Sequence, residues 1–231
     1  MIKAELYKLF NNQVIFLYFL IILLYSLFGN ILYVLENIDI IVLYQNFINE
    51  HLMLFMIVSL FYSSNAISDE YSYYIMPFIN KKKVVESKIV SLVLLLLIIC
   101  LVSFLFSNFI TIIIYKKSFC TYKVLRLLII SFLKKMPLLL ILNLICLFFS
   151  SLFAKASTAL IFTYFIYGIS IYLNKFIVGN NWKLLKYLPS MIWDIEKVVI
   201  NDNLLVYTIF NTIYILLIII LIKVVIKYKK N

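Results

Sequence analysis

The sequence predicts an all-α integral membrane protein with six transmembrane helices and an N-terminal amphipathic helix at the membrane interface. Of the 231 residues, 65% are hydrophobic and 13% are charged, whereas a soluble domain is about half apolar and about a quarter charged. Several apolar runs reach the roughly 20 residues that a helix needs to cross the hydrocarbon layer. These runs occupy most of the chain, so we expect a single transmembrane domain over residues 1–231.

The N-terminal segment, Met1 to Gln13, has the pattern of a helix that lies in the membrane surface. Ile2, Leu6 and Leu9 fall on one side of this helix, and Lys3 and Lys8 fall largely on the other. Hydropathy then predicts spans at about Val14–Leu35, Leu52–Ile67, Ile89–Tyr115, Leu138–Phe153, Ala156–Val178 and Leu204–Val225.

Positive residues divide almost equally between the two sides of this topology, so their total does not orient the chain. The six spans place both termini on the same side of the membrane. Lys81 to Lys83 and the C-terminal lysines lie close to span ends, which favours a cytoplasmic location for both termini. The net charge of +11 is spread over short segments, so it indicates membrane lipid headgroups as partners and no nucleic acid.

Scarce residue types exclude most enzymatic sites. The chain has only three glycines, and it contains neither of the glycine-rich phosphate-binding motifs Gly-x-x-x-x-Gly-Lys and Gly-x-Gly-x-x-Gly. Its single histidine, His51, excludes a two-histidine metal site. The cysteines have no close pair and the serines no evident activating base, so we interpret both as packing residues: Cys100, Cys120, Cys146, Ser59, Ser103, Ser157 and Ser170. We therefore predict that the chain is not an enzyme and holds no metal or cofactor.

The middle of every predicted span is free of charged residues, which argues against an ion-coupled carrier. A channel would need polar residues aligned along a span, and Asn108, Asn143 and scattered hydroxyls do not supply that pattern. The segment Ser68 to Lys88 is different, because it joins an acidic helix end, an apolar turn and a basic stretch. It is either a solvated connection that meets anionic lipid or a docking surface for a partner.

This segment resembles the membrane subunits of the ABC-2 type permease family. In that family a Glu follows span two, a basic residue lies in the loop, and a Lys opens span three; Glu70, Lys82 and Lys88 occupy those places here. Ser72 to Tyr74 replace the usual Gly-Thr. The stretch Trp182 to Ser190 is similar to a Leu-Pro segment in permeases of lantibiotic and bacteriocin immunity transporters.

The resemblance implies a cytoplasmic coupling loop at 68–88 that docks a separate ATPase subunit, which binds the ATP. The candidate coupling residues are Glu70, Tyr71, Lys81, Lys82, Lys83, Glu86 and Lys88. It also implies a half-buried extracellular segment at 179–203, with a candidate extracellular gate formed by Trp182, Tyr187, Pro189 and Trp193.

By the same resemblance, two permease subunits, identical or paralogous, would export an amphipathic substrate, either an antimicrobial peptide or a lipid-like compound, across a bacterial cell membrane. The alternative is a membrane-embedded interaction or assembly factor without a transport cycle. A neighbouring reading frame that encodes a P-loop ATPase without spans would favour the permease.

Overall fold

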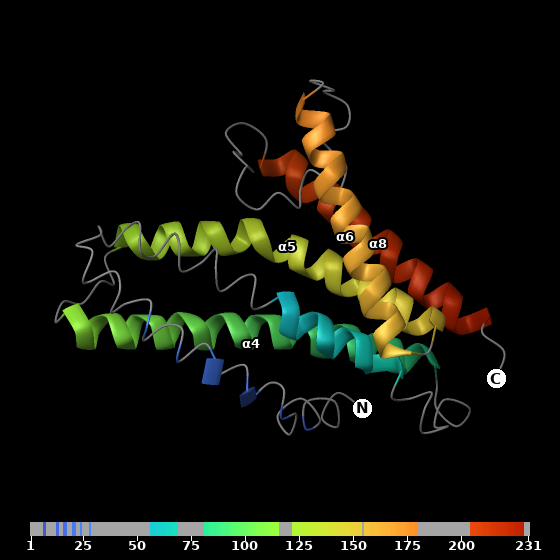
Figure 1. Ribbon diagram of the computed structural model, residues 1–231, viewed down its shortest axis with the longest axis horizontal. Coiled ribbons are helices and arrows are strands. Elements are labelled where there is room, and N and C mark those ends of the chain that lie inside the picture. Colours follow the sequence, from blue (N-terminus) through green and yellow to red (C-terminus); the bar gives the residue numbers. More distant parts are fainter. Residues whose placement is uncertain are drawn as a thin grey trace. The chain divides into compact units, whose positions relative to one another are not determined.

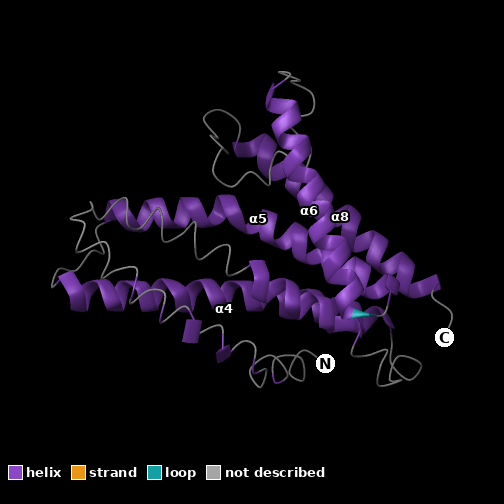
Figure 2. Ribbon diagram, viewed as in Figure 1, coloured by secondary structure: helices purple, strands orange, loops and turns teal. Residues whose placement is uncertain are grey.

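The computed structural model describes residues 56–68, 81–115, 122–153, 155–179 and 204–228, together with eight isolated positions between Tyr7 and Phe28. All of these residues except Lys155 are helical, as the helix colouring of Figure 2 shows. Besides a helix at 56–68, the labelled helices of Figure 1 are α4 (Lys81–Tyr115), α5 (Tyr122–Phe153), α6 (Ala156–Gly179) and α8 (Leu204–Tyr228). The all-α prediction is confirmed for this part of the chain.

Three of the described helices are long and apolar enough to cross a membrane, which makes the chain a membrane protein by length and composition. The apolar windows are Met136–Phe153 in α5, Ala156–Leu173 in α6 and Thr208–Tyr228 in α8. They coincide with the last three predicted spans, Leu138–Phe153, Ala156–Val178 and Leu204–Val225.

The other predicted spans are described in part. Helix α4 includes the predicted span Ile89–Tyr115, and the helix at 56–68 covers most of the predicted span Leu52–Ile67. Apart from the eight isolated helical positions, the predicted interfacial helix Met1–Gln13 and the span Val14–Leu35 lie outside the described residues.

Two helices begin earlier than the apolar spans they contain. Helix α4 begins at Lys81, so the basic end of the predicted coupling loop is helical. Helix α5 begins at Tyr122 and continues through Pro137, whereas hydropathy placed the start of the span just after this proline. Proline usually ends or kinks a helix because it lacks the backbone N–H, but neighbouring helices and side chains allow membrane helices to contain it.

The described residues belong to two compact units. Unit 1 includes Leu60–Leu92 and Pro137–Asn231, and unit 2 includes Ile2–Ser59 and Val93–Met136. In unit 1, α5 is the central helix: 56% of its apolar window is buried, against 17% for the windows of α6 and α8. The core of this unit contains Leu60, Ile67, Leu92, Leu139 and Leu144, each no more than 2% exposed.

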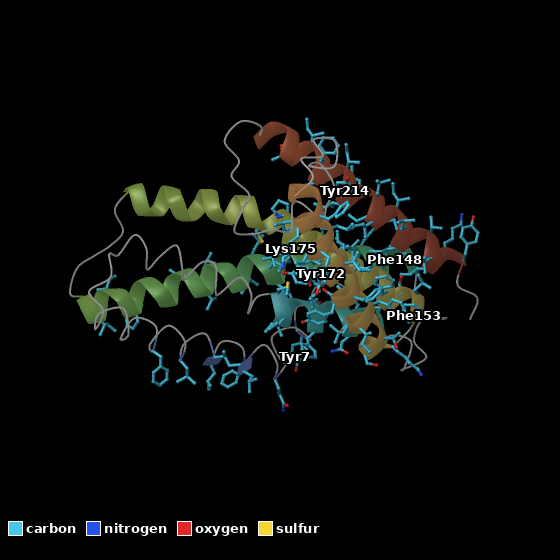
Figure 3. All side chains as sticks on the ribbon, turned by 45° about the horizontal axis from the view of Figure 1, so that its top comes forward. Tyr7, Phe148, Phe153, Tyr172, Lys175 and Tyr214 are labelled. Carbon is cyan, nitrogen blue, oxygen red and sulfur yellow. The ribbon has the colours of Figure 1, made fainter. Side chains whose placement is uncertain are left out.

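Aromatic side chains join the end of α5 to the start of α6. The ring of Phe162 stacks on Phe153, with ring centroids 4.8 Å apart, and lies 5.4 Å from the ring of Phe149. Phe153 is labelled in Figure 3. The Ala159 N–H donates a hydrogen bond of 3.1 Å to the Lys155 carbonyl and so helps to start α6. These contacts fix the tight connection between the two helices.

Candidate functional site

Two features of unit 1 are candidates for function: a buried row of polar side chains and a basic end. The first, which we call the polar seam, lies where the helix at 56–68 packs against α4 and α5. Its side chains are almost completely buried, with the exception of the tyrosine at 9% exposed: Tyr62, Ser63, Ser64, Ser68, Ser91, Asn143, Cys146 and Ser150. Polar groups buried in hydrocarbon need partners, and these side chains find them in one another and in backbone carbonyls.

The seam connects the helix at 56–68 to both neighbouring helices. The Tyr62 and Ser91 hydroxyls are 2.7 Å apart and form the hydrogen bond to α4. The Ser63 hydroxyl donates to Oδ1 of Asn143 on α5, also at 2.7 Å. Nδ2 of the same asparagine donates to the Leu139 carbonyl one turn earlier, so the amide is held in one orientation by bonds on both of its ends.

Ser150 forms the second connection to α5. Its hydroxyl donates to the Ser64 carbonyl at 2.7 Å and accepts from the Ser68 N–H at 3.2 Å. Ser68 is the last described residue of the helix at 56–68, and its N–H donates to a side chain of another helix. Between the two connections, the Cys146 thiol donates a longer contact of 3.6 Å to the Leu60 carbonyl.

The polar seam has the chemistry of helix packing, because its members are hydroxyls, an amide and a thiol. Small residues let helix backbones approach closely in a membrane, and serine or asparagine side chains then bond across the interface. Among the described residues, no group of three or more His, Cys, Asp or Glu side chains could hold a metal ion. Two of the predicted packing residues also form bonds within their own helices: Ser59 donates to the Met56 carbonyl and Ser170 to the Tyr167 carbonyl.

The seam was missed at the sequence level, although the spacing contains a signal. Ser59 and Ser63, Ser64 and Ser68, and Ser87 and Ser91 are each four residues apart, and this spacing places small residues on one helix face. Asn143 lies within a predicted span, where the sequence alone suggests no role beyond a channel lining. Its partner on a different helix could not be identified from spacing alone.

The second feature, the basic end, consists of the start of α4, the connection at Lys155 and the end of α8. The hydrogen bonds of Ser68 to Ser150 and of Tyr62 to Ser91 place the start of α4 level with the end of α5. Nζ of Lys223 on α8 lies 3.3 Å from a carboxylate oxygen of Glu86 on α4. Figure 1 shows the ends of these helices on the same side of unit 1. The described charged residues there are Lys83, Glu86, Lys88, Lys155, Lys223 and Lys227.

The predicted coupling residues differ in their placement. Lys83 and Glu86 are exposed, whereas the Lys88 side chain is 3% exposed and packs inside the unit. Lys81 and Lys82 belong to the first turn of α4, but their side chains are not described. Glu70 and Tyr71 lie outside the described residues, as do all four residues of the candidate gate: Trp182, Tyr187, Pro189 and Trp193.

The Glu86 and Lys223 side chains remain 47% and 40% exposed. An ion pair as accessible as this one contributes about 0–1 kcal/mol to stability. It marks where α4 and α8 meet without being the main source of their association. The buried residues beside it, Val84 and Val85 on α4 and Ile222 and Ile226 on α8, supply the apolar packing in this region.

Comparison of the sequence with protein-family models finds no match, and searches among curated proteins and solved structures find none either.

Proposed function

We propose that this chain is the membrane-spanning permease subunit of an ABC-2 type exporter. It would have six spans preceded by an interfacial helix, and both termini would be cytoplasmic in a bacterial cell membrane. A separate ATPase subunit would bind and hydrolyse ATP, and two permease subunits would move an amphipathic substrate, an antimicrobial peptide or a lipid-like compound. The proposal rests first on the pattern of Glu70, Lys82 and Lys88 after the predicted second span.

The geometry of α4 is the structural observation that supports the proposal best. Lys83 and Glu86 are exposed in its first turns, while Val84 and Val85 between them and Ser87 after them are buried. The start of the helix therefore has one face held by unit 1 and one face accessible to a partner. This pattern is what a coupling segment needs, because a docked ATPase must touch the segment without detaching it.

The length of α4 provides a route for transmitting movement. Its 35 residues correspond to about 52 Å at about 1.5 Å per residue, whereas the hydrocarbon layer is about 30 Å thick. A displacement of the first turns would therefore be carried along one continuous helix into the membrane. ATP-driven changes in transporters proceed by such rigid-body movements of packed elements.

The lysines close to span ends support a cytoplasmic placement of the basic end. Lys81 to Lys83 and the C-terminal lysines have such positions, and positive residues near span ends concentrate on the cytoplasmic side. The predicted coupling segment would then lie on the side where an ATPase subunit binds.

The first test is to isolate the protein gently from its native membrane and identify the co-purifying proteins by mass spectrometry. An ATPase present at about one copy per permease would support the proposal. If no ATPase co-purifies under conditions that preserve other transporter complexes, the interaction-factor alternative is favoured.

The second test concerns coupling. Glu70→Lys and Lys82→Glu should each abolish export while leaving the protein folded in the membrane. Lys175→Glu, a charge reversal of an exposed lysine at the opposite end of α6, is the matched control and should export normally. Wild-type export by the Glu70 and Lys82 variants would refute the assignment of the coupling segment.

A further inference from the structure

Helix α8 carries an exposed apolar stripe that ends at a lysine. Ile209, Ile213, Leu216, Ile220 and Val224 follow one another at intervals of three or four residues, and each is between 44% and 56% exposed. The next position in this pattern is Lys227, which is also exposed. Because residues three and four apart lie on one helix face, the stripe and the lysine form a continuous surface, here called the α8 stripe.

The opposite face of α8 is the one that packs within unit 1. Asn211, Ile222 and Ile226 are at most 2% exposed, and Lys223 at the edge of this face contacts Glu86. From Ile209 to Lys227 the helix rises about 27 Å at about 1.5 Å per residue. The outward face is therefore apolar over nearly the thickness of the hydrocarbon layer, about 30 Å, and becomes cationic where that layer would end.

The end of the stripe has the residues of a membrane interface. Tyr228 is 71% exposed, and Nζ of Lys227 lies 5.4 Å from the centroid of its ring. Tyrosine and lysine both occupy the headgroup level of a membrane, with their apolar parts toward the hydrocarbon. The exposed ammonium of Lys227 is therefore at the level where a lipid headgroup would be.

We propose that the α8 stripe binds one anionic phospholipid. Lys227 contacts the lipid phosphate, and Val224, Ile220 and Leu216 contact an acyl chain. The positive charge of the exposed Lys227 favours an anionic headgroup over a zwitterionic one, since basic residues beside a span attract anionic lipids. The apolar stripe distinguishes a lipid from a free phosphate ion, which would use the lysine alone. The inference stands apart from the transport proposal because it concerns only α8 and the charges around it.

The test uses the full-length protein in phosphatidylcholine nanodiscs that contain increasing fractions of phosphatidylglycerol, with bound lipid measured by native mass spectrometry. The wild-type protein should retain phosphatidylglycerol in preference to phosphatidylcholine, and high salt should weaken this preference. Lys227→Gln should lower the affinity for phosphatidylglycerol about fivefold, the loss expected for one lysine near an anionic surface. Lys227→Arg keeps the charge and should retain binding.

The control is Lys175→Gln, which removes an exposed lysine of α6 beside Tyr172, with both residues labelled in Figure 3. This variant should bind phosphatidylglycerol as the wild type does. Equal retention of the two lipids by the wild type, or an unchanged affinity in Lys227→Gln, would overturn the proposal. Displacement of the lipid by glycerol phosphate at the same concentration would also overturn it, because the stripe would then contribute nothing.

Discussion

The hydrogen bond between Ser63 and Asn143 allows the contribution of the polar seam to be measured directly. Both side chains are fully buried, and the donor and acceptor oxygens are 2.7 Å apart. Hydrogen bonds between membrane helices contribute about 0.6 kcal/mol on average and at most about 1.7 kcal/mol. The bond is short and fully buried, so we expect Ser63→Ala to lower the free energy of unfolding by about 1 kcal/mol, within that range.

The asparagine substitution should cost more. Asn143→Ala removes the same bond, the bond from Nδ2 to the Leu139 carbonyl, and the volume of a buried side chain, so a loss of about 2 kcal/mol or more is expected. The double variant then gives the interaction energy between the two side chains. Because the two side chains share this bond, the sum of the two single losses should exceed the loss of the double variant by about 0.6–1.7 kcal/mol.

Unfolding would be followed by titration with a denaturing detergent in mixed micelles, where the folded and unfolded states interconvert. Ser157→Ala is the matched control, because Ser157 is exposed on α6, and it should change the free energy of unfolding by less than about 0.5 kcal/mol. Strict additivity of the Ser63 and Asn143 variants would refute the inferred bond. An equal loss in Ser157→Ala would show that the method responds to serine removal in general.

Two further predictions concern the other contacts of unit 1. Phe162→Leu loses the ring contacts with Phe153 and Phe149 and should lower the free energy of unfolding by about 1 kcal/mol. The control Phe165→Leu changes a ring that is 64% exposed and should leave the free energy of unfolding unchanged. Equal losses in the two variants would contradict a specific role for the stacked rings. Glu86→Gln removes the accessible ion pair with Lys223 and should lower the free energy of unfolding by less than about 1 kcal/mol. High salt should reduce this difference further. A loss above about 2 kcal/mol would show that the pair is more deeply buried than its exposure indicates.

Hydropathy located the membrane helices because the signal for a span is a local average over about 20 residues. It placed the windows in α5, α6 and α8 to within a few residues. The same average does not detect helical residues that lie outside the hydrocarbon layer. Helix α5 therefore begins at Tyr122, 16 residues before the predicted start at Leu138, since polar residues such as Lys134 and Lys135 are good helix formers even though they do not belong in a bilayer.

The candidate site was accessible to sequence reasoning only in part. The charges of Lys83, Glu86 and Lys88 could be assigned to one segment, but their orientation could not. In α4 Lys83 and Glu86 lie on the exposed face, whereas Lys88 lies on the buried face and is 3% exposed. The contact between Glu86 and Lys223 joins residues 137 positions apart, and no local pattern predicts it.

The polar seam explains why helix neighbours are harder to predict than helix positions in this chain. Between membrane helices, burying one more leucine gains little, because lipid tails are as apolar as the leucine itself. Close approach of small residues and hydrogen bonds across the interface must therefore decide which faces meet. In unit 1 these are the faces of Ser63, Ser91 and Ser150, whereas many of the large apolar side chains of α6 and α8 are exposed. The residues that contribute least to hydropathy thus connect the helix at 56–68 to α4 and α5.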